Sequence, residues 1–307
     1  MSKKISQFDT ITARNNDDWL LIEEATTGVY KKIKVADFLS GLGNIGEPPP
    51  TTSSYDTNAQ AVITAIQNTG LTLSTAQKDA CNARIVAMKN SQVWEKRITY
   101  YGFLGGTAAA HSINWKSPGT YNLVWNGSVN HSGNGVQGDG STGYADTLFN
   151  PQVAGLGANF HFHFYNRTDN PAAIADAGIR DTRVSDQQLT THLKWTDSQI
   201  YFDAPLTRRI STSAGSILGT IIESITATNA FISIKGVTKI SVDVPNANLN
   251  AFNLNIHFLR RNANDNNLNY SNRQYSAFGF GYELTQAQAS SEHESEQTYQ
   301  SALGRSI

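Results

Sequence analysis

The spacing of apolar positions in the C-terminal two thirds of the chain predicts β-strands. From about Val93 nearly to the end, short runs alternate apolar and polar residues, most strictly in Phe160-His161-Phe162-His163-Phe164-Tyr165. A period of two places every second side chain on one face of a strand. Asn, Asp and Gly separate the runs, which is typical of a sandwich or barrel of many short strands. The predicted strands are residues 98–104, 160–165, 199–202, 217–222, 231–234, 239–244, 254–259 and 276–282.

A helical period replaces this pattern before residue 90. Apolar residues recur every three or four positions in two runs that Gly70 separates, and Ser74 is a suitable N-cap for the second run. Two short helices cannot bury both of their apolar faces against each other alone. We therefore expect this pair to pack on the next domain or on copies of itself.

A further helix is predicted at the C-terminal end, over residues 285–303. Thr285 is its candidate N-cap and Gly304 a suitable stop. Three glutamates, Glu292, Glu294 and Glu296, lie on it, and we interpret them as a solvated face.

The first 45 residues predict a small separate unit. Trp19-Leu20-Leu21-Ile22 is a short apolar run, and a turn leads from it to the alternating residues 29–35. This pattern indicates a β-hairpin. So small a unit buries little core, and we expect it to need a partner or self-association. The predicted organisation is an N-terminal unit at 1–45, a Pro-rich linker at 46–56, the helical pair at 57–92 and a β domain at 93–307.

The composition argues against nucleic-acid binding, a membrane span and a disulfide within the chain. Charged residues make up 16% of the 307 residues and the formal net charge is −1, so nothing favours nucleic acid as a partner. No apolar stretch approaches the ~18 residues of a membrane span, and no signal peptide is predicted. The single cysteine, Cys81, excludes an intrachain disulfide and is expected to be buried and inert.

Three pieces of the N-terminal unit, residues 4–8, 18–22 and 32–39, stand out by their spacing. Together they resemble the N-terminal segment of bacteriophage fibre and other virion appendage proteins. The resemblance implies attachment to other virion proteins through residues 1–45, at one end of an oligomeric fibre for which a trimer is expected. The residues expected to make this attachment are Phe8, Trp19, Leu21, Ile33, Val35 and Phe38.

A second resemblance covers residues 94–307. Its marks are residues 94–107, the glycine-rich stretch 134–147, Phe278-Gly279-Phe280-Gly281 and the ending 299–305. They resemble a recurrent phage module similar to concanavalin A-like and laminin-G-like domains. The resemblance implies a mainly β, two-sheet antiparallel jelly-roll sandwich, of a kind that frequently binds glycans. The glycine-rich stretch is interpreted as a connection into a strand, with Asp139 forming its turn.

The same architecture also hosts glycoside hydrolases, which need two carboxyl groups across the sugar. Glu223 is the single glutamate between Ile98 and Tyr282, and Asp203 and Asp243 lack paired spacing with it. We therefore predict that the chain is not an enzyme. A polysaccharide-degrading enzyme on this fold stays the alternative, with a ligand-free decoration protein as the other.

Metal and cofactor binding are not expected either. His161 and His163 share one strand face and could bind one metal, yet no spacing rule connects them to a third ligand such as His257 or Asp176. We interpret them as histidines facing outward or lying at a subunit contact. Asp139, Asp146 and Asn150 are weaker candidates for calcium.

Glycan binding needs aromatic faces and planar polar groups at a concave or loop-edge site. The two asparagines among the candidates come from the polar loop 260–267. The candidate ligand-binding residues are Trp115, Trp125, Trp195, Tyr201, Asn264 and Asn266. The sequence thus predicts a structural appendage, a head or tail fibre located on the virion. Its displayed domain would contact host-surface glycans.

Overall fold

The computed structural model describes two backbone strands near the N-terminus, Trp19–Glu23 and Tyr30–Lys34, together with residues 55–183, 187–204, 208–244, 248–266 and 268–307. Contacts within the chain divide it into two units, Met1–Ser54 and Tyr55–Ile307. In the first unit, β1 (Trp19–Glu23) and β2 (Tyr30–Lys34) pair antiparallel, with Leu21 opposite Lys32. The predicted hairpin is therefore present, and Trp19, Leu21 and Ile33 lie on its strands. Phe8, Val35 and Phe38 fall outside the described residues.

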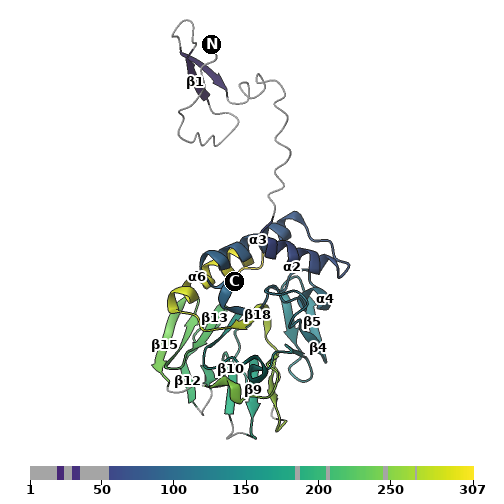
Figure 1. Cartoon of the computed structure of the whole chain (residues 1–307), viewed down its shortest axis with the longest axis vertical. Coiled ribbons are helices and arrows are strands. Elements are labelled where there is room, and N and C mark those ends of the chain that lie inside the picture. Colours follow the sequence, from purple (N-terminus) through teal and green to yellow (C-terminus); the bar gives the residue numbers. More distant parts are fainter. Residues whose placement is uncertain are drawn as a thin grey trace. The chain divides into compact units, whose positions relative to one another are not determined.

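The second unit is a mainly β sandwich of two eight-stranded sheets, which confirms the predicted jelly-roll class. Among the described strands of this unit, all pairs are antiparallel except that between β17 and β9. We call one sheet the covered sheet because helices lie over it (Figure 1). Its strand order is β15 (Val237–Asp243), β14 (Asn229–Ile234), β13 (Gly219–Ile225), β8 (Phe160–Asn166), β18 (Gln274–Gly281), β6 (Gly135–Gly138) and β5 (Val129–Ser132), with β3 (Arg97–Tyr101) on β18.

The second sheet forms the other side of the sandwich, and we call it the outer sheet. Several of its strands, β9 and β10 among them, were not predicted, because their sequences lack a clear alternation. Its order is β12 (Arg208–Ser213), β11 (Gln199–Ala204), β10 (Gln187–His192), β9 (Ala177–Asp181), β16 (His257–Phe258), β7 (Tyr144–Asp146) and β4 (Val124–Asn126), with β17 (Arg261–Ala263) on β9.

Phenylalanines fill the space between the sheets. In β8, Phe162 pairs with Phe280 and Phe164 with Phe278 of β18, and all four side chains are fully buried. The ring of Phe278 stacks on Phe258 of the outer sheet at a centroid distance of 4.2 Å. The alternation in residues 160–165 therefore has the cause that the sequence suggested: every second residue faces the core.

Three longer helices lie on the other face of the covered sheet (Figure 1). They are α2 (Thr57–Gln67), α3 (Thr75–Asn90) and α6 (Gln286–Ala302). Ser74 and Thr285 are the N-caps of α3 and α6, as the sequence predicted, and each forms a capping box with the glutamine three residues later. Buried residues of the helices share a second core with Tyr100, Tyr165 and Ile222 of the sheet. Of the two packing modes expected for the helical pair, packing on the β domain is therefore the one observed.

Short helical segments fill the connections. They are η1 (Trp94–Lys96), α4 (Ala108–His111), α5 (Pro151–Ala154) and η2 (Leu249–Ala251). No helix in the part of the chain that the structure describes has the length and apolar character to cross a membrane. Cys81 is buried with a free thiol, and burial raises its pKa.

The glycine-rich stretch 134–147 carries the chain from the covered sheet to the outer sheet, from β6 to β7. The Asp139 carboxylate accepts hydrogen bonds from the backbone N–H groups of Ser141, Thr142 and Gly143, at 2.8–2.9 Å. A Cβ on Gly143 would lie 2.1 Å from the carbonyl oxygen of Ser128, so only glycine fits there. Asp139 therefore forms the turn, as predicted.

Candidate functional site

One face of the outer sheet carries a continuous row of mostly polar residues. Residues directly opposite each other on antiparallel strands point to the same face of the sheet. Leu189 and Phe202 of the same strands are in the core, so the row lies on the face away from it. Helices α2, α3 and α6 cover the other sheet (Figure 1). The row runs through Arg209, Asp203, Thr190, Gly178, His257 and Asp146.

Aromatic and charged side chains gather at the β10–β11 hairpin end of this face. We call His192, Trp195, Tyr201, Asp203 and Arg209 the hairpin cluster. The hairpin turn closes where the Trp195 N–H donates to the Gln199 carbonyl at 2.8 Å. The indole of Trp195 meets the ring of His192 edge-on at 4.9 Å, and His192 pairs with Tyr201 across the strands. Trp195 and Tyr201 are half-buried, so both keep surface open to solvent.

Asp203 and Arg209 hold the polar side of the hairpin cluster. Arg209 donates from Nε and Nη2 to the two oxygens of Asp203, at 2.6 and 2.9 Å, and its guanidinium lies 4.5 Å from the centre of the Tyr201 ring. Burial alone would raise the pKa of Asp203, but the hydrogen bonds from Arg209 and His192 outweigh it and lower the pKa. The site therefore combines a fixed carboxylate with a guanidinium and two aromatic faces.

The remaining predicted tryptophans lie elsewhere. Trp115 is 1% exposed and packs between Tyr100 and Tyr299 in the second core, so its predicted contact with a glycan is contradicted by burial. Trp125 lies on β4 at the other edge of the outer sheet. Its Nε1 donates to the Ala108 carbonyl at 2.9 Å, and it contacts His131 edge-on at 4.6 Å. It is thus remote from the hairpin cluster in strand order.

Asn264 and Asn266 are exposed in the loop that follows β17. The Asn264 side chain accepts hydrogen bonds from the N–H and hydroxyl of Thr182 and donates to Asp181. Asn266 adopts a φ of 61°, in the left-handed region that asparagine tolerates. Both asparagines therefore have a local role in loop structure, and the loop does not join the hairpin cluster.

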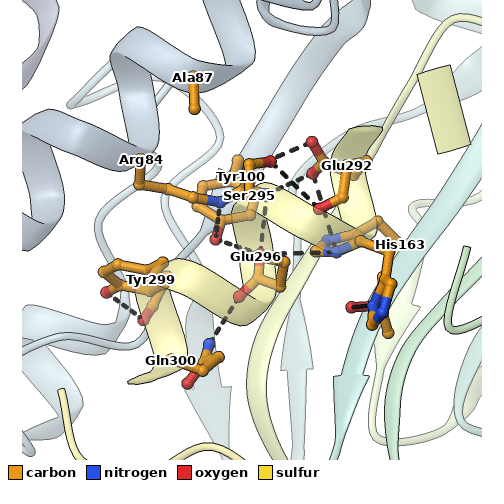
Figure 2. Close-up of polar contacts among 12 residues, drawn as sticks. Arg84, Ala87, Tyr100, His163, Glu292, Ser295, Glu296, Tyr299 and Gln300 are labelled. Atoms are coloured by element: carbon orange, nitrogen blue, oxygen red, sulfur yellow. Dashed lines mark hydrogen bonds and ion pairs between the residues drawn. The ribbon is translucent and has the colours of Figure 1, made fainter. Parts of the chain in front are cut away.

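A separate cluster of charges is buried between α3, α6 and the covered sheet (Figure 2). Arg84 donates to Glu292, to Glu296 at 2.8 Å and to Ser295 at 2.7 Å, and the three charged side chains have no exposed surface. Tyr100 donates to Glu296 at 2.7 Å. The prediction that these glutamates form a solvated face is wrong for Glu292 and Glu296. Their spacing of four places both on the buried side of α6, and Glu294 alone is exposed.

His161 and His163 face this buried cluster, neither solvent nor a subunit contact. Arg97 donates to Nε2 of His161 at 2.8 Å, so the proton of the neutral ring sits on Nδ1, which donates to the Tyr282 carbonyl. Burial first, and then the charge of Arg97, lower the pKa of His161 to about 3. His163 lies 3.6–3.8 Å from Glu296 and Glu292.

His163, Glu292 and Glu296 have the donor types of a metal site, and their ligand atoms lie within 4.8 Å of one another. The guanidinium groups of Arg84 and Arg97 already bond to these carboxylates. Burial alone would raise the pKa of Glu292, but the two arginine charges hold it well below its usual range. The arrangement is an ion-pair network that ties α3 and α6 to the sheet.

The carboxylates considered for catalysis do not meet at a site. Glu223 is buried inside the sandwich, where Thr191 donates to it at 2.7 Å and burial raises its pKa well above the usual value. Asp176, the other metal-ligand candidate, is buried and accepts from both Arg273 and Tyr275. Asp243 lies at the end of the edge strand β15. Glu223 therefore has no route to a sugar held at the surface.

No protein-family model matches the chain, and no curated protein matches its sequence. Similar solved structures include the binding domain of botulinum neurotoxin DC in complex with rat synaptotagmin II, at 14% identity over 66% of this chain and 52% of that chain, with a TM-score of 0.46. A botulinum neurotoxin type C structure, described with cell entry dependent upon two ganglioside molecules, gives 13% identity, 68% and 53% coverage and a TM-score of 0.46.

Domain 4 of AbnA, a GH43 extracellular arabinanase from Geobacillus stearothermophilus in complex with arabinotriose, is also similar. It is 13% identical over 64% of this chain and 98% of that domain, with a TM-score of 0.40. The chain spans about half the length of the two neurotoxin chains.

Proposed function

We propose that this chain is a structural appendage protein of a bacteriophage particle, and that its β domain binds host-surface glycans on the outer face of the outer sheet. The observation that carries the glycan proposal is the hairpin cluster. Trp195 and Tyr201, both selected from the sequence, lie in one hairpin beside the Asp203–Arg209 pair.

The chemistry of the hairpin cluster suits a sugar. A sugar ring presents apolar C–H faces and equatorial hydroxyl groups, so it pairs with aromatic faces and with planar polar groups held in fixed positions. The Arg209 guanidinium is fixed by two hydrogen bonds to Asp203 and stacks on Tyr201. Its side chain nevertheless keeps 52% of its surface exposed and so can reach a ligand.

The proposal is tested on a glycan array with the purified full chain and the variants Trp195→Ala and Tyr201→Ala. Truncating an aromatic anchor should weaken binding about ten-fold or more, as for other binding hot spots. Tyr282→Ala is the matched control, because Tyr282 is a 45%-exposed aromatic residue that follows a strand of the covered sheet. Binding that survives both hairpin substitutions would place the ligand elsewhere, and an array without any bound glycan would favour a ligand-free decoration protein.

The appendage role rests on the resemblance of residues 1–45 to virion-attachment segments. Particles should carry the chain on their surface, visible by electron microscopy with a labelled antibody against residues 94–307. Deleting residues 1–45 should abolish incorporation into particles without unfolding the β domain. Sedimentation of the full chain should show a trimer, and a stable monomer at micromolar concentration would contradict the oligomer.

The proposal includes no catalytic role. The buried position of Glu223, where Thr191 donates to its carboxyl group, supports this part. Incubation of the full chain with host polysaccharide should release no reducing sugar. Release that Glu223→Gln abolishes would contradict it and favour the depolymerase alternative.

A further inference from the structure

Arg260 lies in a second cluster on the same face of the outer sheet, two residues after β16. Its guanidinium carbon is 3.4 Å from the centre of the Tyr144 ring and 5.2 Å from that of Tyr270. The residue is 8% exposed, while both tyrosines are half-buried. A nearly buried cation is thus held against one aromatic face and close to a second.

The hydrogen bonds of Arg260 go to neutral groups. Its Nε donates to Nδ1 of His257 at 3.1 Å, and its Nη1 donates to the hydroxyl of Tyr270 at 2.6 Å. Within the described parts of the chain, Arg260 forms no ion pair with a carboxylate. Several other arginines of the domain have one: Arg84, Arg97, Arg183, Arg209 and Arg273.

His257 links this cluster to one carboxylate, that of Asp146, which lies on the far side of the His257 ring. Since Nδ1 of His257 accepts from Arg260, its proton lies on Nε2, which is 3.8 Å from Asp146. Asp146 accepts hydrogen bonds from the Asn255 side chain and from the N–H of Leu148. Asp146 therefore orients the imidazole, which in turn holds the guanidinium, and it does not itself bind Arg260.

One edge of the guanidinium remains open. Among the described residues, none accepts a hydrogen bond from Nη2 of Arg260, yet Nη2 is not one of the buried polar atoms that lack a partner, so it reaches solvent. A guanidinium that is fixed at Nε and Nη1 loses little freedom when a ligand binds its remaining N–H groups. Its planar fork matches a carboxylate, which accepts two parallel hydrogen bonds.

We propose that Arg260, with Tyr144 and Tyr270 beside it, is the subsite that binds the carboxylate of an acidic sugar, a sialic acid or a uronic acid, within the glycan. This inference rests on the proposed glycan-binding function. His257 lies in the same cross-strand row as Asp203 of the hairpin cluster, with Thr190 and Gly178 between them. Three strand spacings correspond to roughly 14 Å, so a short oligosaccharide can contact both clusters.

Calorimetry on the full chain tests the proposal with two matched pairs of probes: sialyllactose against lactose, and trigalacturonate against its carboxyl-reduced form. One acidic probe should bind about ten-fold or more tightly than its neutral counterpart, because the bond to Arg260 is charge-assisted. The pair in which this ratio appears distinguishes a sialic acid from a uronic acid. Added salt should weaken the binding of the acidic probe and leave the binding of the neutral probe unchanged.

Arg260→Gln should bring the acidic probe down to the affinity of its neutral counterpart. Lys239→Gln is the control for net charge, because Lys239 is exposed on β15 of the covered sheet, and it should leave the ratio unchanged. Arg260→Lys keeps the charge without the planar fork, and it should lose most of the preference for the acidic probe over the neutral one. If Arg260→Gln does not fold, Arg260→Lys and the salt dependence of binding by the wild-type chain still decide the proposal.

Two results would overturn the inference while leaving glycan binding intact. One is equal affinity for the acidic and neutral probes. The other is a preference for the acidic probe that persists in Arg260→Gln, while Trp195→Ala abolishes binding of the probes. If none of the four probes binds and the glycan array is also empty, the inference and the proposed function fall together.

Discussion

Replacing Arg84 with methionine tests the buried charge network most directly. Arg84 lies on α3 without exposed surface, and its guanidinium bonds to Glu292 and Glu296 of α6 and to Ser295 (Figure 2). Methionine fills most of the aliphatic volume and removes the charge. Arg97 then remains bonded to Glu292, while Glu296 keeps no arginine partner within the described part of the chain. The substitution therefore leaves negative charge in the protein interior without compensation.

The expected loss of stability is large. Removing one partner of a buried ion pair costs about 3–5 kcal/mol, because the other charge stays desolvated. In a domain of roughly 150–250 residues, each kcal/mol lowers Tm by about 2–4 °C, so Tm should fall by roughly 6–20 °C. Thermal unfolding of the full chain at pH 7, followed by circular dichroism, measures this change.

Lys89→Met is the matched control, because it removes a cation from the same helix. Lys89 binds Asp56 at 2.7 Å, with side chains 31% and 22% exposed. Solvated pairs of this kind contribute about 0–1 kcal/mol, so Tm should change little. The double variant Arg84→Met with Glu292→Gln should be more stable than the sum of its single changes predicts. A Tm for Arg84→Met within about 2 °C of wild type would refute the reasoning.

Three further predictions concern titration and the loop turn. Because the pKa of His161 is lowered to about 3 in the folded protein, the unfolded chain takes up a proton at higher pH than the folded one. As the pH is lowered from about 6.5, the free energy of unfolding measured in urea should therefore decrease, by about 1.4 kcal/mol per pH unit for each such histidine. His161→Gln should make this pH dependence less steep. The pKa of Glu223 is raised in the folded protein, so Glu223→Gln should increase Tm at pH 7–8. This increase should vanish near pH 4. A Tm difference between variant and wild type that stays constant across pH would contradict the prediction. Asp139→Ala should cost roughly 1–2 kcal/mol and speed amide exchange at Gly143, whereas an unchanged exchange rate would show that the turn holds without the carboxylate.

The sequence by itself determined most of the local structure. Alternation placed Phe160, Phe162 and Phe164 on one face of a strand, and these residues form the core between the sheets. Ser74 and Thr285 start their helices with capping boxes. Both signals depend on residues within a few positions of each other, which is the range over which a pattern can be read along the chain.

The candidate site was only partly accessible in the same way. Trp195 and Tyr201 could be selected as large aromatics, and they lie close together because one hairpin contains both. Nothing in the sequence distinguished Trp195 from Trp115, which has the same residue type and is buried. Exposure is a property of the packed domain, so residue type alone could not separate these candidates.

Tertiary structure alone decided the two charged clusters. Glu292 and Arg84 are distant in sequence and meet because α6 returns the chain to α3 over the covered sheet. Arg260 reaches Tyr144 because β16 pairs with β7 in the outer sheet. Long-range register determines which charged groups lie beside an opposite charge and which do not. The order of residue types along the chain does not specify that register, so the contacts of these residues could be identified only in the folded domain.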